Sequence, residues 1–275
     1  MSRTPDEEAM IERFSRQYPL GQAAVMREIE RAVCGCDYGG TSWTTRREAE
    51  RIGRLLGLGP GRRLLDLGAG SGWPGLYLAG MTGCDIALVD VPLSGLRIAA
   101  ERAAADRLSG ACWVVAADGA GLPFRSAWFD AIGHSDVLCC LEAKLAVLRD
   151  CRRVIRAGGR MVFTVISVAP GLATADRKRA VEFGPPFVEA RAGYPAMLRQ
   201  AGWTIVERID VTAEFANSVR AHLRAEEAHA DELCELLGAA EFSERVTGRR
   251  GTVRAAEEGL LRRELFAATT AVASA

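Results

Sequence analysis

The feature that most constrains the fold is a glycine-rich turn between an apolar run and a helical pattern, in the stretch LLDLGAGSGWPGLYLA at residues 64–79. Three glycines, Gly68, Gly70 and Gly72, stand where a buried strand is expected to end and a helix to begin. Small residues there let the backbone turn tightly and approach a ligand, and the free amides of the first helical turn attract an anionic group. Pro74 suits that turn, because no amide hydrogen bond is lost there. The stretch therefore predicts a ligand-binding strand–turn–helix unit.

Further apolar runs extend this unit into a sheet. Strands are expected at 63–68, 85–91, 112–118, 129–137, 160–168, 204–211 and 263–272, with helices at 10–32, 46–58, 73–80, 94–107, 142–156 and 194–200. The helix at 142–156 is expected to close at Ala157, Gly158 and Gly159. Alternating strands and helices are typical of a parallel sheet covered on both faces. The sequence predicts a doubly wound, mostly parallel, seven-stranded α/β sheet of the Rossmann-like type with a helical cap.

The chain is expected to have three parts. Residues 1–44 form an N-terminal helical segment, residues 45–212 together with 263–275 form the α/β core, and residues 213–262 form a helical insertion. Breaks in that insertion are expected near Gly238 and at Gly248 and Gly251. Ligands of open α/β sheets bind outside the carboxyl ends of the strands. The N-terminal segment and the insertion are therefore predicted to cover the active site.

Composition and charge exclude several classes of partner. The chain has 35 basic and 35 acidic residues, so it lacks the basic excess that nucleic-acid binding by counterion release requires. No apolar run approaches the roughly 18–20 residues of a membrane span, and the first residues lack a signal core. We therefore expect a cytoplasmic protein, a monomer or homodimer, with a small molecule as its partner and no nucleic acid or membrane.

Two classes of ligand compete for the glycine turn. GSGWPG at residues 70–75 matches the dinucleotide fingerprint Gly-x-Gly-x-x-Gly, which is a weak signal alone. Asp66, however, precedes the glycines, and a carboxylate there is unfavourable beside a pyrophosphate but suits the ammonium end of a methionine moiety. Asp90 ends the second predicted strand, where an acid can accept hydrogen bonds from both hydroxyls of a ribose. The two acids favour an adenosyl ligand that carries an amino acid.

With these residues the chain resembles the class I S-adenosylmethionine-dependent methyltransferases, in the small-molecule branch that includes the ubiquinone and menaquinone C-methyltransferases. The resemblance covers about residues 45–168 and rests on DLGAGSG (66–72), LVDVP (88–92), AADGAGLPF (116–124), FDAIGHSDVL (129–138) and RAGGRMVF (156–163). It implies S-adenosyl-L-methionine as cofactor. The expected cofactor site consists of Asp66, Gly68, Ala69, Gly70, Gly72, Asp90, Val91, Asp118, Gly119 and Ser135.

The resemblance also assigns parts of this site. In that family the acid after the third strand contacts the adenine amino group, which implies Asp118 here, with residues 122–124 along the adenine edge. The backbone near His134 and Ser135 would approach the methionine part. Many relatives carry a histidine near the end of the fourth-strand motif, where this chain has two cysteines at 139–140. No catalytic residue is therefore carried over from the family.

The acceptor pocket is expected under the helical insertion. An apolar stripe there, made of Phe215, Val219, Leu233 and Leu237, follows helical spacing. His222, Glu226 and His229 lie on or beside that stripe, and polar side chains on a buried face usually have a partner or a function. We hypothesise that they line the acceptor pocket, with His222 and Glu226 as catalytic candidates. The alternative is a helix edge where they meet solvent.

Further candidates come from the predicted core. His134 ends the fourth strand, where a neutral imidazole can take a proton from a hydroxyl or amine acceptor, or only shape the pocket. Tyr38, Trp43 and Tyr194 are candidates for aromatic walls around an apolar acceptor or the sulfonium, and equally for ordinary core residues.

The predicted function is the transfer of a methyl group to O, N or C of a small, apolar or aromatic molecule. One alternative is a nicotinamide-dependent oxidoreductase that uses GSGWPG, and another is a non-catalytic cofactor-binding protein of the same fold. Cys34 with Cys36, or Cys139 with Cys140, could bind a soft metal, and the spacing of residues 222, 226 and 229 also permits a metal. The favoured prediction has no metal site.

Overall fold

The centre of the molecule is a seven-stranded sheet with strand order β3-β2-β1-β4-β5-β7-β6. The computed structural model describes residues 4–190 and 192–271. The strands are β1 (Arg63–Leu67), β2 (Asp85–Asp90), β3 (Cys112–Ala116), β4 (Phe129–Ser135), β5 (Ile155–Val168), β6 (Thr204–Asp210) and β7 (Leu261–Thr269). β7 lies antiparallel between β5 and β6, and the other pairs are parallel. The predicted doubly wound, mostly parallel sheet of seven strands is confirmed.

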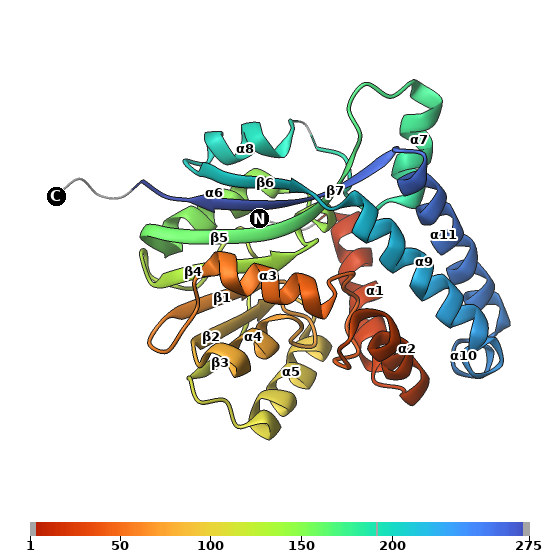
Figure 1. Ribbon diagram of the computed structural model, residues 1–275, viewed down its shortest axis with the longest axis horizontal. Helices are drawn as coiled ribbons and strands as arrows, with labels where there is room; N and C mark the ends of the chain where they lie inside the picture. The colour runs from red at the N-terminus through yellow and green to blue at the C-terminus, as the bar shows by residue number, and fades with distance from the viewer. Residues whose placement is uncertain (1–3, 191, 272–275) are drawn as a thin grey trace.

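Helices cover both faces of the sheet (Figure 1). One face carries α3 (Arg46–Leu56), α4 (Gly75–Thr82) and α5 (Leu93–Asp106), and the other carries α6 (Lys144–Val154) and α8 (Tyr194–Gln200). Side chains alternate between the two faces along each strand, so Leu64 and Val162 enter one core while Leu65 and Phe163 enter the other. β1 and β2 are mostly apolar because both of their faces are buried, whereas the outer strands β3 and β6 are partly exposed.

The remaining helices gather at the carboxyl edge of the sheet, where Figure 1 shows the red N-terminal helices facing the blue C-terminal ones. They are α1 (Pro5–Gly21), α2 (Ala24–Cys34), α7 (Thr174–Phe183), α9 (Thr212–Ala228), α10 (Ala230–Leu237) and α11 (Ala239–Glu257), with a short 3-10 turn, η1 (Leu138–Cys140). α2 packs against α9, and α9 packs against α11, so segments far apart in the sequence enclose one space. Among the described residues, no helix combines the length and the apolar character needed to span a bilayer.

Several predicted boundaries differ from the structure. The helix expected at 10–32 is two helices, α1 and α2, because α1 contains Pro19 near its end and stops at Gly21. The helix expected at 142–156 ends at Val154, and the glycines at 158–159 belong to β5 and are not its cap. Pairing of β5 with β4 begins already at residue 155 and overrides the local glycine signal. The predicted ranges 1–44, 263–272 and 263–275 extend into residues 1–3 and 272–275, which lie outside the described residues.

The glycines of the helical insertion behave differently from one another. Gly238 separates α10 from α11, as predicted, whereas Gly248 and Gly251 lie inside α11. A Cβ at Gly251 would overlap the ring of Phe183 on α7, so this glycine permits the contact between the two helices. A Cβ at Gly248 would meet nothing within 4 Å. Gly251 is needed within the helix because α7 packs closely against it, and the sequence pattern does not reveal this contact.

This difference predicts opposite effects for two alanine substitutions in one helix. Gly248→Ala should raise the free energy of unfolding by about 0.5–1 kcal/mol, because alanine loses less backbone entropy and has open space. Gly251→Ala should lower it by about 1 kcal/mol, since overpacking against Phe183 outweighs the same gain. Chemical denaturation of both variants checks this, and equal stabilisation by both would show that α7 does not pack closely on α11.

Candidate active site

A cavity of about 1130 Å³ lies at the carboxyl edge of the sheet. Its walls come from the glycine turn and the ends of the central strands on one side, and from α1, α2, α7, α9 and α11 on the other. Ligand pockets in proteins are typically about 300–1000 Å³. The cavity therefore has room for two small molecules side by side.

The glycine turn is held by the carboxylate at the end of β2. The amide of Gly70 donates to Oδ2 of Asp90 at 2.8 Å, and the amide of Val91 donates to Oδ1 at 2.7 Å. Gly70 has φ of 51°, and a Cβ there would lie 2.7 Å from the ring of Tyr18 on α1. The turn thus needs glycine both for its left-handed backbone and for the close approach of α1.

Asp66 lines the cavity, and its buried carboxyl lacks a full set of partners. Only 4% of the residue is exposed, and among the described residues its Oδ2 has no hydrogen-bond partner. It sits against Gly75, where a Cβ would overlap the carboxylate. Burial and then the charge of Asp90 raise the pKa of Asp66 to about 8, and burial raises the pKa of Asp90 to about 6. An unpartnered buried oxygen is costly unless a ligand supplies a donor.

The structure brings the predicted cofactor residues together. Nine of them line the cavity, namely Asp66, Gly68, Ala69, Gly70, Asp90, Val91, Asp118, Gly119 and Ser135. Gly72 does not line it, and the space beside its Cα is taken by Leu76. Ser71, which was not predicted, lines the cavity with a hydroxyl that has no partner among the described residues.

His134 lies away from the cavity. Its ring stacks on Phe163 at 4.5 Å between centroids, only 2% of the residue is exposed, and neither ring nitrogen has a partner among the described residues. Burial lowers its pKa to about 3. Its neighbour Ser135 lines the cavity, since successive side chains of a strand point to opposite faces. This placement argues against the predicted role of His134 as a base.

His222 and Glu226, the two catalytic candidates on the helical insertion, both line the cavity. His222 donates from Nδ1 to the carbonyl oxygen of Ser218 at 3.0 Å, so its Nε2 is the acceptor and faces the thiol Sγ of Cys34 at 3.8 Å. Glu226 is fully buried between two arginines of α11. Burial alone would raise its pKa, but the arginines outweigh burial and hold the pKa below its ordinary value. Glu226 is therefore an ion-pair partner and not a poised general base, which corrects its predicted role.

Only one of the predicted pocket-wall residues lies in the cavity wall. Trp43 lines it and packs edge-on against Phe215 and His222. The other three, Tyr38, Tyr194 and His229, do not line it. Tyr38 packs against Trp73, and Tyr194 packs against Phe163 and Phe266, so both tyrosines are core residues. Nδ1 of His229 lies 2.9 Å from Oε1 of Glu232.

Besides Ser71, the cavity residues Tyr18 and Arg249 escaped the sequence analysis because their positions depend on tertiary contacts. Tyr18 is 6% exposed and lies against the glycine turn, although its place in α1 looks like an ordinary apolar position. Arg249 on α11 reaches the cavity wall, with its guanidinium 4.9 Å from the ring centroid of Trp43. An arginine beside another in an exposed-looking helix gives no signal of this kind.

The metal alternatives find no support in the structure. Within residues 4–190 and 192–271, no cluster of three or more His, Cys, Asp or Glu side chains is arranged to hold a metal ion. All eight cysteines are free thiols.

Comparison with known proteins identifies the domain. Residues 65–163 match a family model described as a methyltransferase domain. This part of the chain is therefore a methyltransferase domain. The chain is 32% identical over 164 residues to 27-O-demethylrifamycin SV methyltransferase of Amycolatopsis mediterranei, covering 58% of this chain and 60% of the relative. It is 27% identical over 179 residues to methyltransferase GfsG of Streptomyces halstedii, covering 61% and 62%. The matches thus span about three fifths of the length of these relatives.

A solved structure shows the same fold. Phosphoethanolamine N-methyltransferase 2 of Haemonchus contortus aligns with a TM-score of 0.77 at 17% identity, covering 94% of this chain and 60% of that chain. S-adenosylmethionine is the cofactor, as predicted. The site fits it, because Asp66 and the glycine turn line the cavity, and the Oδ2 of Asp66, which has no hydrogen-bond partner among the described residues, offers an acceptor to an ammonium group.

Proposed function

We propose that this methyltransferase transfers a methyl group from S-adenosylmethionine to O, N or C of a small, apolar or aromatic molecule. The observation that carries the proposal is one cavity with two different halves. Carboxylates of Asp66, Asp90 and Asp118 mark the end formed by the sheet, while Trp43 and Phe215 belong to the wall under the helical insertion. The known relatives are named for methyl transfer to small molecules such as a demethylrifamycin, which agrees with this division.

The three carboxylates suit the three polar parts of the cofactor. Asp66 would accept from the methionine ammonium, Asp90 from the ribose hydroxyls, and Asp118 from the adenine amino group. Asp90 already accepts from two backbone amides, and each carboxylate oxygen has a second lone pair for a ligand. The backbone of the glycine turn would lie along the cofactor, where side chains would obstruct it.

The bound cofactor supplies an electrophilic methyl group, so the chain has little acid–base chemistry to perform. Its residues hold the acceptor in line with the methyl group and exclude water, which together lower the barrier. α1, α2, α9 and α11 enclose the cavity and perform this role.

We propose accordingly that residues 1–44 and 213–262 are the cover of the acceptor site. His222 remains the candidate for a base, since its Nε2 can accept a proton. The cytoplasmic location, the monomeric or homodimeric state and the lack of a nucleic-acid partner remain predictions.

Calorimetric titration with S-adenosylmethionine, S-adenosylhomocysteine and NADH tests the proposal. We expect micromolar binding of both adenosyl compounds and none of NADH. Asp90→Ala should weaken binding at least tenfold, because hydrogen bonds to a charged group contribute about 1.5–3 kcal/mol each. Asp106→Ala, at the exposed end of α5, is the matched control and should bind like the parent protein.

Asp90→Asn separates loss of charge from loss of the turn, since the amide oxygen can still accept from Gly70. Binding of NADH alone would contradict the proposal and favour the nicotinamide-dependent alternative. Formation of S-adenosylhomocysteine with an added acceptor distinguishes the enzyme from a non-catalytic binding protein.

A further inference from the structure

Two arginines of α11 share a single carboxylate at the cavity wall. Nε of Arg245 donates to Oε1 of Glu226 at 2.7 Å, and Nε of Arg249 donates to Oε2 at 2.5 Å. All three residues line the cavity, and the Glu226 side chain is fully buried. One carboxylate balances one guanidinium, so this group of three residues carries an excess positive charge.

Arg249 has N–H donors that no other residue of the described chain uses. Within the described part of the chain, its terminal nitrogens have no hydrogen-bond partner, and its only ion pair uses Nε. Its side chain is 17% exposed and lies over the Trp43 ring, beside the proposed acceptor space. Burying a second guanidinium beside an already paired carboxylate is costly without another partner. The planar fork of an arginine is suited to bind two oxygens of a carboxylate or phosphate at once.

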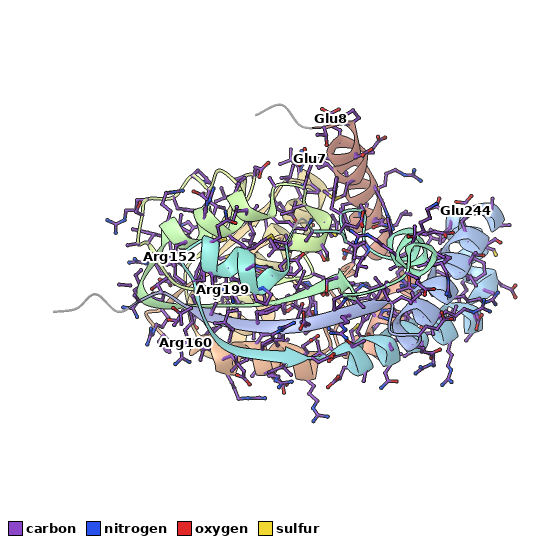
Figure 2. All side chains as sticks on the ribbon, turned by 90° about the horizontal axis from the view of Figure 1, so that it is seen from above. Glu7, Glu8, Arg152, Arg160, Arg199 and Glu244 are labelled. Carbon is purple, nitrogen blue, oxygen red and sulfur yellow. The ribbon has the colours of Figure 1, made fainter. Side chains whose placement is uncertain are left out.

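The exposed acidic residues at the opening of the cavity do not offset this charge. Glu182, Glu241 and Glu244 line the opening but are exposed, and Glu241 already faces Arg16 at 3.4 Å. Figure 2 shows Glu244 on α11 and Glu7 on α1 at the surface. Water and salt screen exposed charges. Of the buried acids that line the cavity, Glu30 accepts from the amides of Gly39 and Gly40, and Asp66 lies at the end formed by the sheet. Beside Trp43, the group of Arg245, Arg249 and Glu226 therefore supplies a net positive charge.

We propose that the methyl acceptor carries an anionic group, a carboxylate or a phosphate, which Arg249 binds beside Trp43. This inference rests on the proposed function, because it places the anion in the acceptor half of the same cavity. The rest of the acceptor lies against the ring of Trp43 and the neighbouring Phe215. Arg249 thus selects an acidic acceptor over its neutral analogue, and Glu226 orients the guanidinium through Nε.

Three small probes test the inference on the protein saturated with S-adenosylhomocysteine: benzoate, phenyl phosphate and neutral benzamide. We expect at least one anion to bind at least tenfold more tightly than benzamide, in a calorimetric or NMR titration. Arg249→Met should remove that preference, and Arg249→Lys should retain part of it, because lysine keeps the charge but loses the fork. Arg250→Gln is the control, since Arg250 pairs with Glu227 on the surface with 57% of its side chain exposed.

Each result has a distinct meaning. A preference for benzoate identifies a carboxylate acceptor, and a preference for phenyl phosphate identifies a phosphorylated one. Equal binding of benzamide, no binding of either anion, or an unchanged preference in Arg249→Met would overturn the inference. Binding of S-adenosylhomocysteine by each variant shows that it is folded. Failure of the parent protein to bind this compound would contradict the proposed function instead.

Discussion

Arg263→Met is expected to lower the free energy of unfolding by about 3–5 kcal/mol, the effect of removing one partner from a buried ion pair. Arg263 on β7 is 1% exposed and donates to both oxygens of Asp136 at 3.0 Å and to both oxygens of Glu48 at 2.8 and 2.9 Å. It also donates to the hydroxyl of Thr164 at 3.1 Å. Without the guanidinium, two nearly buried carboxylates would face each other uncompensated.

The neighbouring Arg262 offers a matched control, because it is exposed on the same strand. Arg262→Met should change the free energy of unfolding by less than about 0.5 kcal/mol. Thermal unfolding should show a melting temperature on the order of 10 °C lower for Arg263→Met alone. Adding Asp136→Asn and Glu48→Gln should recover part of the loss, since no buried charge would then lack a partner. Equal effects of the two arginine variants would contradict the role assigned to the ion pairs.

Asp66→Asn is expected to stabilise the cofactor-free protein at pH 8 and to weaken cofactor binding by about 10- to 100-fold. The asparagine amide is neutral, so folding no longer buries a negative charge at this position. It cannot form an ion pair with the ammonium group of the cofactor, and hydrogen bonds to charged groups contribute about 1.5–3 kcal/mol. Calorimetry at pH 8 and chemical denaturation measure the two effects on the same protein. Asp106→Asn, on the exposed end of α5, should alter neither.

The pH dependence of stability has a definite sign. The folded-state pKa of Asp66, about 8, lies above its ordinary value of 3.8, so the folded protein holds a proton that the unfolded chain releases. The contribution of this group to stability is complete below pH about 4 and is lost as the pH rises to about 8. Asp66→Asn should therefore unfold with a flatter pH dependence across that range. Cofactor binding at pH 7 should release close to one proton, because an ammonium partner favours the carboxylate, and titrations in buffers of different ionisation enthalpy measure it.

Local patterns in the sequence determined the sheet and the cofactor half of the cavity. The strand, the glycine turn and the acid at the end of the next strand are close in sequence, and their geometry follows from backbone sterics and parallel pairing. Asp66, Gly70 and Asp90 could therefore be expected to lie together without a structure, and all three line the cavity. The same reasoning gave seven strands, but it did not give their order or the antiparallel place of β7.

The acceptor half was decided by tertiary structure. His134 and Ser135 are adjacent in sequence, and only the pairing of β4 with β5 determined which of them faces Phe163 and which faces the cavity. Glu226 looked like a free acid until α11 placed two arginines on it. The role of a charged side chain depends on partners that are distant in the sequence, because Coulombic and desolvation energies act through space. Local periodicity predicts that such a side chain is buried, whereas the packing of helices determines what it binds.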